Sequence, residues 1–380
     1  MPSRFARRDI GWERGAFSSS TDRARYSWGV ILGDVALLIV ALFVILVGAE
    51  LFTNGIEWFG RKLELAEGAV GSVLAAVGTA MPETMIPVIA ILFTSGDAGH
   101  EIGVGAILGA PFMLATLAMF VTGVAVLARS RNGRSDVMLV DKGVLTHDLR
   151  YYAVCYAIAI GVAFVPVDLF IVRILAAFLL IGIYGWYVKE HFEADPDVDA
   201  EDLSPLRLHR VDRRAHRSDP SVPRLRVVSL QVIAALMLII IGAFFFVDAV
   251  GAVASSFGLD EALLALVIAP IATELPEKFN SVIWVRQRKD TLAMGNITGA
   301  MVFQSAIPTV VALLFAGAAW TVTEGSLLAF ASAGIAFASV FVIFALGRSN
   351  ELRGRRLLFG GVLYLVYLIL VALQLSGALG

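Results

Sequence analysis

Long apolar runs separated by short polar segments dominate the hydrophobic pattern of this chain. A helix needs about 20 mostly apolar residues to cross the hydrocarbon core of a bilayer, and each run is close to or above that length. The pattern therefore predicts ten transmembrane helices, over residues 29–53, 66–95, 101–127, 151–167, 169–188, 226–250, 258–285, 291–316, 325–346 and 356–378.

The composition agrees with a membrane protein. Of the 380 residues, 58% are hydrophobic and 16% are charged, whereas soluble domains average about 45–50% and about 25%. This balance excludes a disordered chain, a nucleic-acid binder and an ordinary water-soluble enzyme. The first run starts near Trp28 and is too long for the core of a signal peptide, so we expect it to be the first helix. The single cysteine, Cys155, excludes an internal disulfide.

The positive charges alternate between loops. The loops after helices 1, 3, 5, 7 and 9 hold 22 of the 30 lysines and arginines, and the even-numbered loops hold none. Because cytoplasmic loops are enriched in Lys and Arg, we expect the odd loops in the cytoplasm and both termini outside. Six arginines in the N-terminal tail argue the other way, but the alternation of the loops is the broader signal. We expect the plasma membrane of a prokaryote.

The two halves of the sequence resemble each other. With a shift of 194 residues, Val73, Thr79, Pro82 and Glu83 align with Val267, Thr273, Pro276 and Glu277. With a shift of 190 residues, GAILGA (105–110) aligns with GNITGA (295–300). Two five-helix halves must have opposite orientations because five is odd. We therefore predict an all-α integral membrane fold of two inverted repeats, an arrangement with which many secondary transporters build a site at the midplane.

The repeated Pro-Glu pair has the chemistry of a cation site. Glu83 and Glu277 are far from the ends of their apolar runs, where an acidic side chain is costly unless it is paired, protonated or hydrated. The proline before each glutamate removes a backbone donor, which frees the carbonyl about four residues earlier. Thr79 and Thr273 add hydroxyls. Such oxygen ligands suit a hard cation such as Ca²⁺; the alternative is a protonated glutamate bonded to a neighbouring helix.

The second repeated element is rich in glycine. Glycines four residues apart in 105–110 and 295–300 let helix backbones approach closely. Packing is the simpler interpretation of this spacing. Such packing would place the third helix beside the seventh and the eighth beside the second.

These motifs resemble the two alpha-repeats of the calcium/cation antiporter superfamily, which includes sodium/calcium and calcium/proton exchangers. The family pattern is roughly G-[ST]-[ST]-x-P-E followed by G-N-x-x-G-S-N-x-x-[ND] in each half. Here the first parts read GTAMPE (78–83) and ATELPE (272–277), and the second parts read GAILGAPFML (105–114) and GNITGAMVFQ (295–304). The chain is similar to a divergent member of that family over nearly its whole length after residue 29.

The resemblance implies a central cation site made by Glu83 and Glu277, with Thr79 and Thr273 contributing. Asn296 and Gln304 stand at positions that could line or tune the ion path. The departures lie in the second elements, where Ala110, Ala300 and Leu114 replace side chains that offer oxygen atoms. Two glutamates can balance one divalent cation and take up protons when it leaves, so this thinned set favours H⁺ over Na⁺ as the counter-ion.

Glu274 and Lys278 are a further departure from the family pattern. They are four residues apart, a spacing that brings side chains together on one face of a helix. One interpretation is an ion pair that neutralises itself. The other is that Lys278 acts as a tethered cation beside Glu277 and weakens or replaces a metal site.

The expected organisation is an N-terminal tail (1–28), a first repeat (29–188), a cytoplasmic linker (189–225) and a second repeat (226–380). We expect a secondary antiporter that exchanges Ca²⁺ or a similar cation for H⁺ or Na⁺, with no cofactor and with lipid and inorganic cations as its partners. The alternative is a non-transporting membrane protein that keeps the fold as a binding or regulatory module. Asp168 and Arg173 are expected to pair or to reach the interface at an external helix end.

Overall fold

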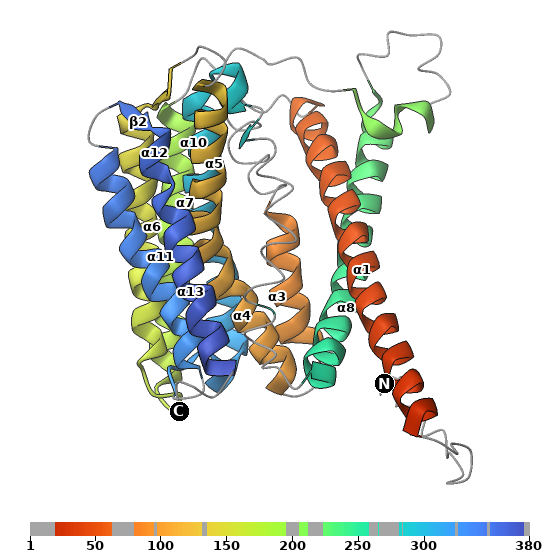
Figure 1. The fold of residues 1–380 in the computed structure, drawn as a ribbon. Coiled ribbons are helices and arrows are strands. Elements are labelled where there is room, and N and C mark those ends of the chain that lie inside the picture. The colour runs from red at the N-terminus through yellow and green to blue at the C-terminus, as the bar shows by residue number, and fades with distance from the viewer. Residues whose placement is uncertain are drawn as a thin grey trace.

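The computed structural model describes residues 20–62, 80–94, 97–130, 135–194, 205–211, 223–257, 265, 281–282, 284–323, 326–347 and 350–375. These residues form a helical bundle with one short β-ribbon at one end (Figure 1). In chain order its elements are α1 (Ser20–Lys62), α3 (Met81–Phe93), α4 (Asp97–Met113), η2 (Leu114–Ala118), α5 (Met119–Ser130), β1 (Val137–Leu139), α6 (Lys142–Ala163), α7 (Phe170–Ala194), η3 (Arg207–Val211), α8 (Leu225–Phe257), α10 (Asp290–Phe315), η4 (Gly317–Trp320), α11 (Leu327–Leu346), β2 (Glu351–Arg353), α12 (Gly354–Leu357) and α13 (Phe359–Leu375).

The helices follow the predicted apolar runs. Eight of the ten runs lie largely on described helices, whereas 66–95 and 258–285 are described only in part. Within the described residues, seven helical stretches are long and apolar enough to cross a membrane. The helix α6 is not among them, because His147, Asp148 and Arg150 make its first half polar.

Connections that are far apart in sequence meet at the two ends of the bundle. At one end β1, which precedes α6, pairs antiparallel with β2, which follows α11. At the other end the amide of Val322, which follows α10, donates to the carbonyl of Ala163 at the end of α6 (3.0 Å). In Figure 1 the helix α1 begins and the helix α13 ends at the same end of the molecule, and η3 lies at the opposite end.

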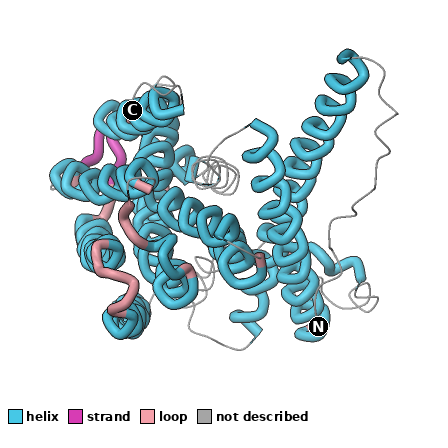
Figure 2. The backbone as a smooth tube through the Cα atoms, turned by 90° about the horizontal axis from the view of Figure 1, so that it is seen from below, coloured by secondary structure: helices cyan, strands magenta, loops and turns pink. Residues whose placement is uncertain are grey.

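The helices α1 and α8 form a pair at one side of the main bundle. They lie against each other over much of their length, and α3 lies between α8 and the other helices (Figures 1 and 2). The helix α3 packs against α4, α8 and α10. The contact between α3 and α10 is the one predicted for the second and eighth apolar runs.

Two glycines set the close approach of α1 and α8. A Cβ at Gly48 would lie 2.8 Å from Ile239 Cγ1, and a Cβ at Gly242 would lie 2.7 Å from Ile45 Cγ1. Gly48 and Gly242 are 194 positions apart, and so are Ile45 and Ile239. This is also the separation of the two Pro-Glu motifs. The contact is therefore reciprocal, as a two-fold relation between the two helices requires.

The linker segment η3 docks on this helix pair. Gln231 of α8 is fully buried and accepts a hydrogen bond from the amide of Leu208 (2.8 Å). It donates to Asn54 Oδ1 (3.0 Å), which also accepts from the amide of Arg207 (3.0 Å). Leu206 packs with Trp58 in a small cluster of its own. The linker therefore binds both helices at the end of the pair.

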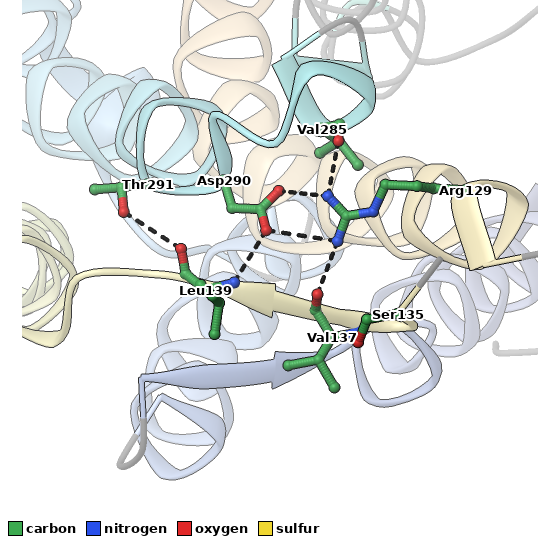
Figure 3. Close-up of polar contacts among 7 residues, drawn as sticks. All are labelled: Arg129, Ser135, Val137, Leu139, Val285, Asp290 and Thr291. Carbon is green, nitrogen blue, oxygen red and sulfur yellow. Dashed lines mark hydrogen bonds and ion pairs between the residues drawn. The ribbon is translucent and has the colours of Figure 1, made fainter. Parts of the chain in front are cut away.

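A buried ion pair joins three segments at the ribbon end of the main bundle (Figure 3). Arg129, in the last turn of α5, lies 2.8 Å from Asp290 Oδ1 in the first turn of α10. The guanidinium also donates to the carbonyls of Val285 (2.8 Å) and Val137 (2.7 Å), and Asp290 accepts from the amide of Leu139 (3.0 Å). Each charge is thus both paired and hydrogen-bonded, which a buried ion pair requires.

The expected pairing of Asp168 with Arg173 is wrong. Arg173 is 1% exposed and donates to the carbonyls of Gly317 and Trp320 and to the Thr321 hydroxyl. Its side chain thus caps η4 from within the protein, whereas Asp168 is exposed. The spacing along the chain could not reveal this, because the acceptors come from residues more than 140 positions away.

Candidate cation-transport site

Glu83 lies buried at the start of a helix. It is 6% exposed and stands in the first turn of α3, which begins at Met81 and carries Pro82 at its start. Proline is well tolerated there, since the first amide of a helix has no intrahelical acceptor. The Thr84 hydroxyl donates to the carbonyl of Ala80 (2.8 Å).

The neighbouring helix α10 carries further polar side chains. Gln304 is 3% exposed, and its amide oxygen has no hydrogen-bond donor among the described residues. Asn296 lies two turns earlier and is half-buried. Because α3 packs against α10, the helix that holds Glu83 lies beside the helix that holds these two amides.

Two further buried hydroxyls were not singled out by the sequence. The hydroxyls of Ser281 and Thr309 are buried and have no hydrogen-bond partner among the described residues. Ser281 follows Glu277 by four positions, the spacing of one helix face. That spacing is the signal that could have identified Ser281. Thr309 lies in an apolar stretch of α10, and nothing in the sequence around it marks it.

The glycines of the element 295–300 do not make the predicted contact, whereas the predicted neighbour of the element 105–110, the seventh apolar run, is described only in part. Cβ atoms at Gly295 and Gly299 would lie 3.7 Å from Val144 and 3.4 Å from Tyr187, so these glycines face α6 and α7 rather than α3. The helix α4 approaches α3 closely at two other glycines, Gly99 and Gly103, where a Cβ would lie 2.5 Å from the Ala90 carbonyl and 2.4 Å from Ile91 Cγ1.

Thr298, inside the element 295–300, belongs to a contact that the sequence did not suggest. Its hydroxyl donates to Asp148 Oδ2 (2.5 Å), and Tyr187 donates to Asp148 Oδ1 (3.0 Å). Asp148 is 1% exposed. The contact therefore joins α10 to α6 and α7 around one buried carboxylate.

Two of the departures from the exchanger motif lie in the protein core, and the third, Ala300, is partly exposed. Ala110 and Leu114 are 3% and 0% exposed. Leu114 starts the π-helical turn η2, whose Thr116 carbonyl lies so close to Gly360 of α13 that a Cβ there would clash. A π-helical turn is often found at a functional site, but here packing against α13 also accounts for it.

The remaining predicted site residues, Thr79, Thr273, Glu274, Glu277 and Lys278, lie outside the described residues. The part of the chain that the structure describes contains no group of three His, Cys, Asp or Glu side chains able to hold a metal ion. Glu83, Asn296 and Gln304 are therefore the predicted site residues whose surroundings are visible.

Seven helical stretches of the described residues are long and apolar enough to cross a membrane, and a buried acid such as Glu83 in an apolar segment is a feature of ion pathways in membrane proteins. The family model of the sodium/calcium exchanger protein matches residues 34–189 and 228–376. The chain belongs to this family. It is a cation antiporter of the calcium/cation superfamily and not an enzyme.

Curated relatives and solved structures agree with this assignment. The inner membrane protein YrbG of Escherichia coli is 25% identical over 272 residues, which cover 72% of this chain and 77% of YrbG. The putative antiporter CaxA of Alkalimonas amylolytica is 23% identical over 70% of this chain and 76% of its own length.

The fold resembles two solved exchangers. The H⁺/Ca²⁺ exchanger CAX matches with a TM-score of 0.66 and 13% identity, over 93% of this chain and 88% of its own. The sodium-calcium exchanger NCX_Mj matches with a TM-score of 0.55 and 16% identity, over 88% of this chain and 97% of its own. At such identities the likeness concerns the fold.

Proposed function

We propose that this antiporter exchanges Ca²⁺, or a similar divalent cation, for H⁺ or Na⁺ at a site that includes Glu83 and Glu277. The observation that carries the proposal is the buried carboxylate of Glu83 at the start of α3, on a helix that packs against α10 with its buried Gln304. Thr79 and Thr273 supply further oxygen ligands. Two carboxylates neutralise one divalent cation and accept protons after it leaves.

The full architecture is part of the same proposal. Ten transmembrane helices form two inverted repeats, 29–188 and 226–380, joined by the linker 189–225. The reciprocal contacts of Gly48 and Gly242 support this two-fold relation. The connections that carry the positive charges meet at the ribbon end, where β1 pairs with β2, and this end faces the cytoplasm of a prokaryotic cell.

H⁺ is the favoured counter-ion. Leu114 is an apolar, fully buried residue where the exchanger motif has Asn or Asp, and Ala110 and Ala300 replace serines. Fewer oxygen ligands remain for separate sodium ions. Of the two solved structures that this fold resembles, one is named an H⁺/Ca²⁺ exchanger and the other a sodium-calcium exchanger. Transport measurements therefore decide the counter-ion of this protein.

Direct Ca²⁺ binding to the purified protein tests the site. We expect the parent to bind Ca²⁺, and E83Q and E277Q to bind it at least about tenfold more weakly, because each replacement removes one charged oxygen ligand. E101Q is the matched control, since Glu101 is exposed at the start of α4. Equal Ca²⁺ affinity of the parent, E83Q and E277Q would contradict the site. Absence of binding in the parent would contradict Ca²⁺ as the transported cation.

Lys278 has two proposed roles that one variant separates. If Lys278 is a tethered cation beside Glu277, K278A binds divalent cations more tightly or changes the preference among them. If Lys278 only neutralises Glu274, K278A keeps the parent's ion preference and loses stability. Ca²⁺ and Na⁺ competition in the same binding assay distinguishes the two results.

A further inference from the structure

A surface pocket between α6 and α7 lies apart from the residues of the proposed cation site. It has a volume of about 590 Å³ and is lined by the basic side chains of Lys142, His147 and Arg150, together with Tyr151 and Glu190. A second groove of about 350 Å³ shares Arg150 and Tyr151 and continues along Val154, Ile183 and Trp186. A polar pocket is therefore continuous with an apolar groove.

The charges in this pocket favour an anion. Lys142 and Arg150 are exposed and have no hydrogen-bond or ion-pair partner among the described residues. The one lining carboxylate, Glu190, is already engaged: its Oε2 lies 2.9 Å from His147 Nε2 and 2.6 Å from the Tyr151 hydroxyl. The two permanent positive charges thus remain available to a ligand.

Other charged groups nearby are occupied as well. Asp141 caps α6 by accepting from the amide of Val144 (3.1 Å), and Asp148 is buried behind the pocket. Lys189 lies over the Trp186 ring, 5.0 Å from its centroid. Trp186 in turn donates to Glu190 Oε1 (2.8 Å).

The groove has the features of a surface that faces lipid. Val154 is 50% exposed and Trp186 is 55% exposed, and both belong to apolar runs that we assign to the bilayer. Tryptophan and tyrosine are enriched at the depth of the headgroups. The basic pocket therefore lies at headgroup level, with the groove directed along the acyl chains.

We propose that this pocket is a binding site for an anionic phospholipid. The headgroup phosphate lies between Lys142 and Arg150, and one acyl chain occupies the groove along Val154 and Ile183. Basic pockets between transmembrane helices bind lipids of this class. Asp148, adjacent to His147 in the chain, accepts a hydrogen bond from Thr298 of α10, so the occupied pocket adjoins the contact that holds α6 against α10.

Lipid binding to the purified full-length protein tests this site. Native mass spectrometry compares retained phosphatidylglycerol with retained phosphatidylcholine. We expect the parent to prefer phosphatidylglycerol and K142Q/R150Q to bind it about tenfold more weakly. R355Q/R356Q is the matched control, because it removes two exposed arginines from α12, outside the pocket; we expect it to bind as the parent does. V154W, which fills the groove without changing a charge, weakens binding.

Several results would overturn the proposal. They are equal retention of the two lipids by the parent, equal loss in the two double variants, and unchanged binding in K142Q/R150Q or in V154W. Glycerol phosphate serves as the probe without acyl chains. If it displaces the phospholipid at equal concentration, the pocket is a site for soluble phosphate esters and the lipid assignment is wrong.

Discussion

Arg129 and Asp290 show how single residues hold the transport scaffold together. Their side chains are 4% and 6% exposed, and the pair links α5, α10 and the ribbon strand β1. A buried charge that loses its partner is costly, whereas joint replacement of the pair by apolar residues costs much less. The contribution of this pair is therefore mainly the avoidance of an isolated buried charge.

We predict that R129M destabilises the protein by about 3–5 kcal/mol, because Asp290 is left buried without its cation. The double variant R129M/D290L should recover much of this loss. Unfolding of the detergent-solubilised protein by heat and by denaturant measures both. Equal destabilisation in the single and double variants would show that the hydrogen bonds to the backbone, and not the ion pair, hold the segment.

His147 gives stability a dependence on pH. The neighbouring Asp148 carboxylate, 3.9 Å from His147 Nδ1, is the largest influence that raises the pKa of His147 above the ordinary value of 6.5; burial lowers the pKa, and the hydrogen-bonded Glu190 raises it further. A raised pKa means that the folded protein holds the proton more tightly than the unfolded chain. The stabilisation is therefore complete below about pH 6.5 and is lost as pH rises through the raised pKa.

We predict that the parent loses more thermal stability between about pH 6 and about pH 8 than H147Q does. Glutamine keeps a hydrogen-bonding side chain but has no proton to lose in this range. H100Q is the control, since His100 lies in α4 away from this cluster. If the parent and H147Q show the same pH dependence, another group is responsible.

At the scale of elements, the packing of α1 on α8 depends on Gly48 and Gly242. A Cβ added at either glycine would lie only 2.7–2.8 Å from an isoleucine Cγ1 of the other helix. We predict that G48L and G242L each lower stability by about 1–3 kcal/mol, because a larger side chain forces the helices apart. G33L and G251L are the controls, since a Cβ at either position has nothing within 4 Å. Effects as large in the controls would mean that helix propensity and not packing is disturbed.

The linker segment η3 is held by Gln231 together with Asn54 and Glu50. We predict that Q231L releases this segment, because the variant loses its bonds to Leu208, Asn54 and the carbonyl of Leu51. Limited trypsin digestion should then cut after Arg207 at least about fivefold faster, since each lost buried bond is worth about 1 kcal/mol. Q287L, which changes an exposed glutamine, should leave the rate unchanged. An unchanged rate in Q231L would show that the packing of Leu206 on Trp58 and the bonds of Arg207 to Asn54 and Glu50 are sufficient to hold the segment.

Apolar length predicted the helices well, and contacts across the chain were harder to predict. The run 151–167 missed the first nine residues of α6, because Lys142–Arg150 is polar. The ribbon was also missed, since strands of three residues carry no periodic signal and depend on pairing between Val137 and Arg353. The burial of Glu83 could be predicted because the residue lies far from the ends of a long apolar run. Arg173 was misassigned because its acceptors are remote in sequence.

At the scale of the whole molecule, the structure has two parts that meet at α3. The pair α1–α8 packs on itself more extensively than on the main bundle, and α3 and α4 form its interface with that bundle. The helix that carries Glu83 thus lies at the boundary between the two parts. Movement of the α1–α8 pair along this boundary is the step that we propose for alternating access.

The most direct test of this account is cation flux in proteoliposomes under imposed gradients of pH or Na⁺. We predict that a gradient of H⁺ or Na⁺ drives Ca²⁺ uptake by the parent and by E101Q, and that E83Q and E277Q abolish it. Equal flux in the parent and E83Q would contradict the assigned site, and absence of gradient-driven Ca²⁺ flux in the parent would contradict Ca²⁺ as the transported ion.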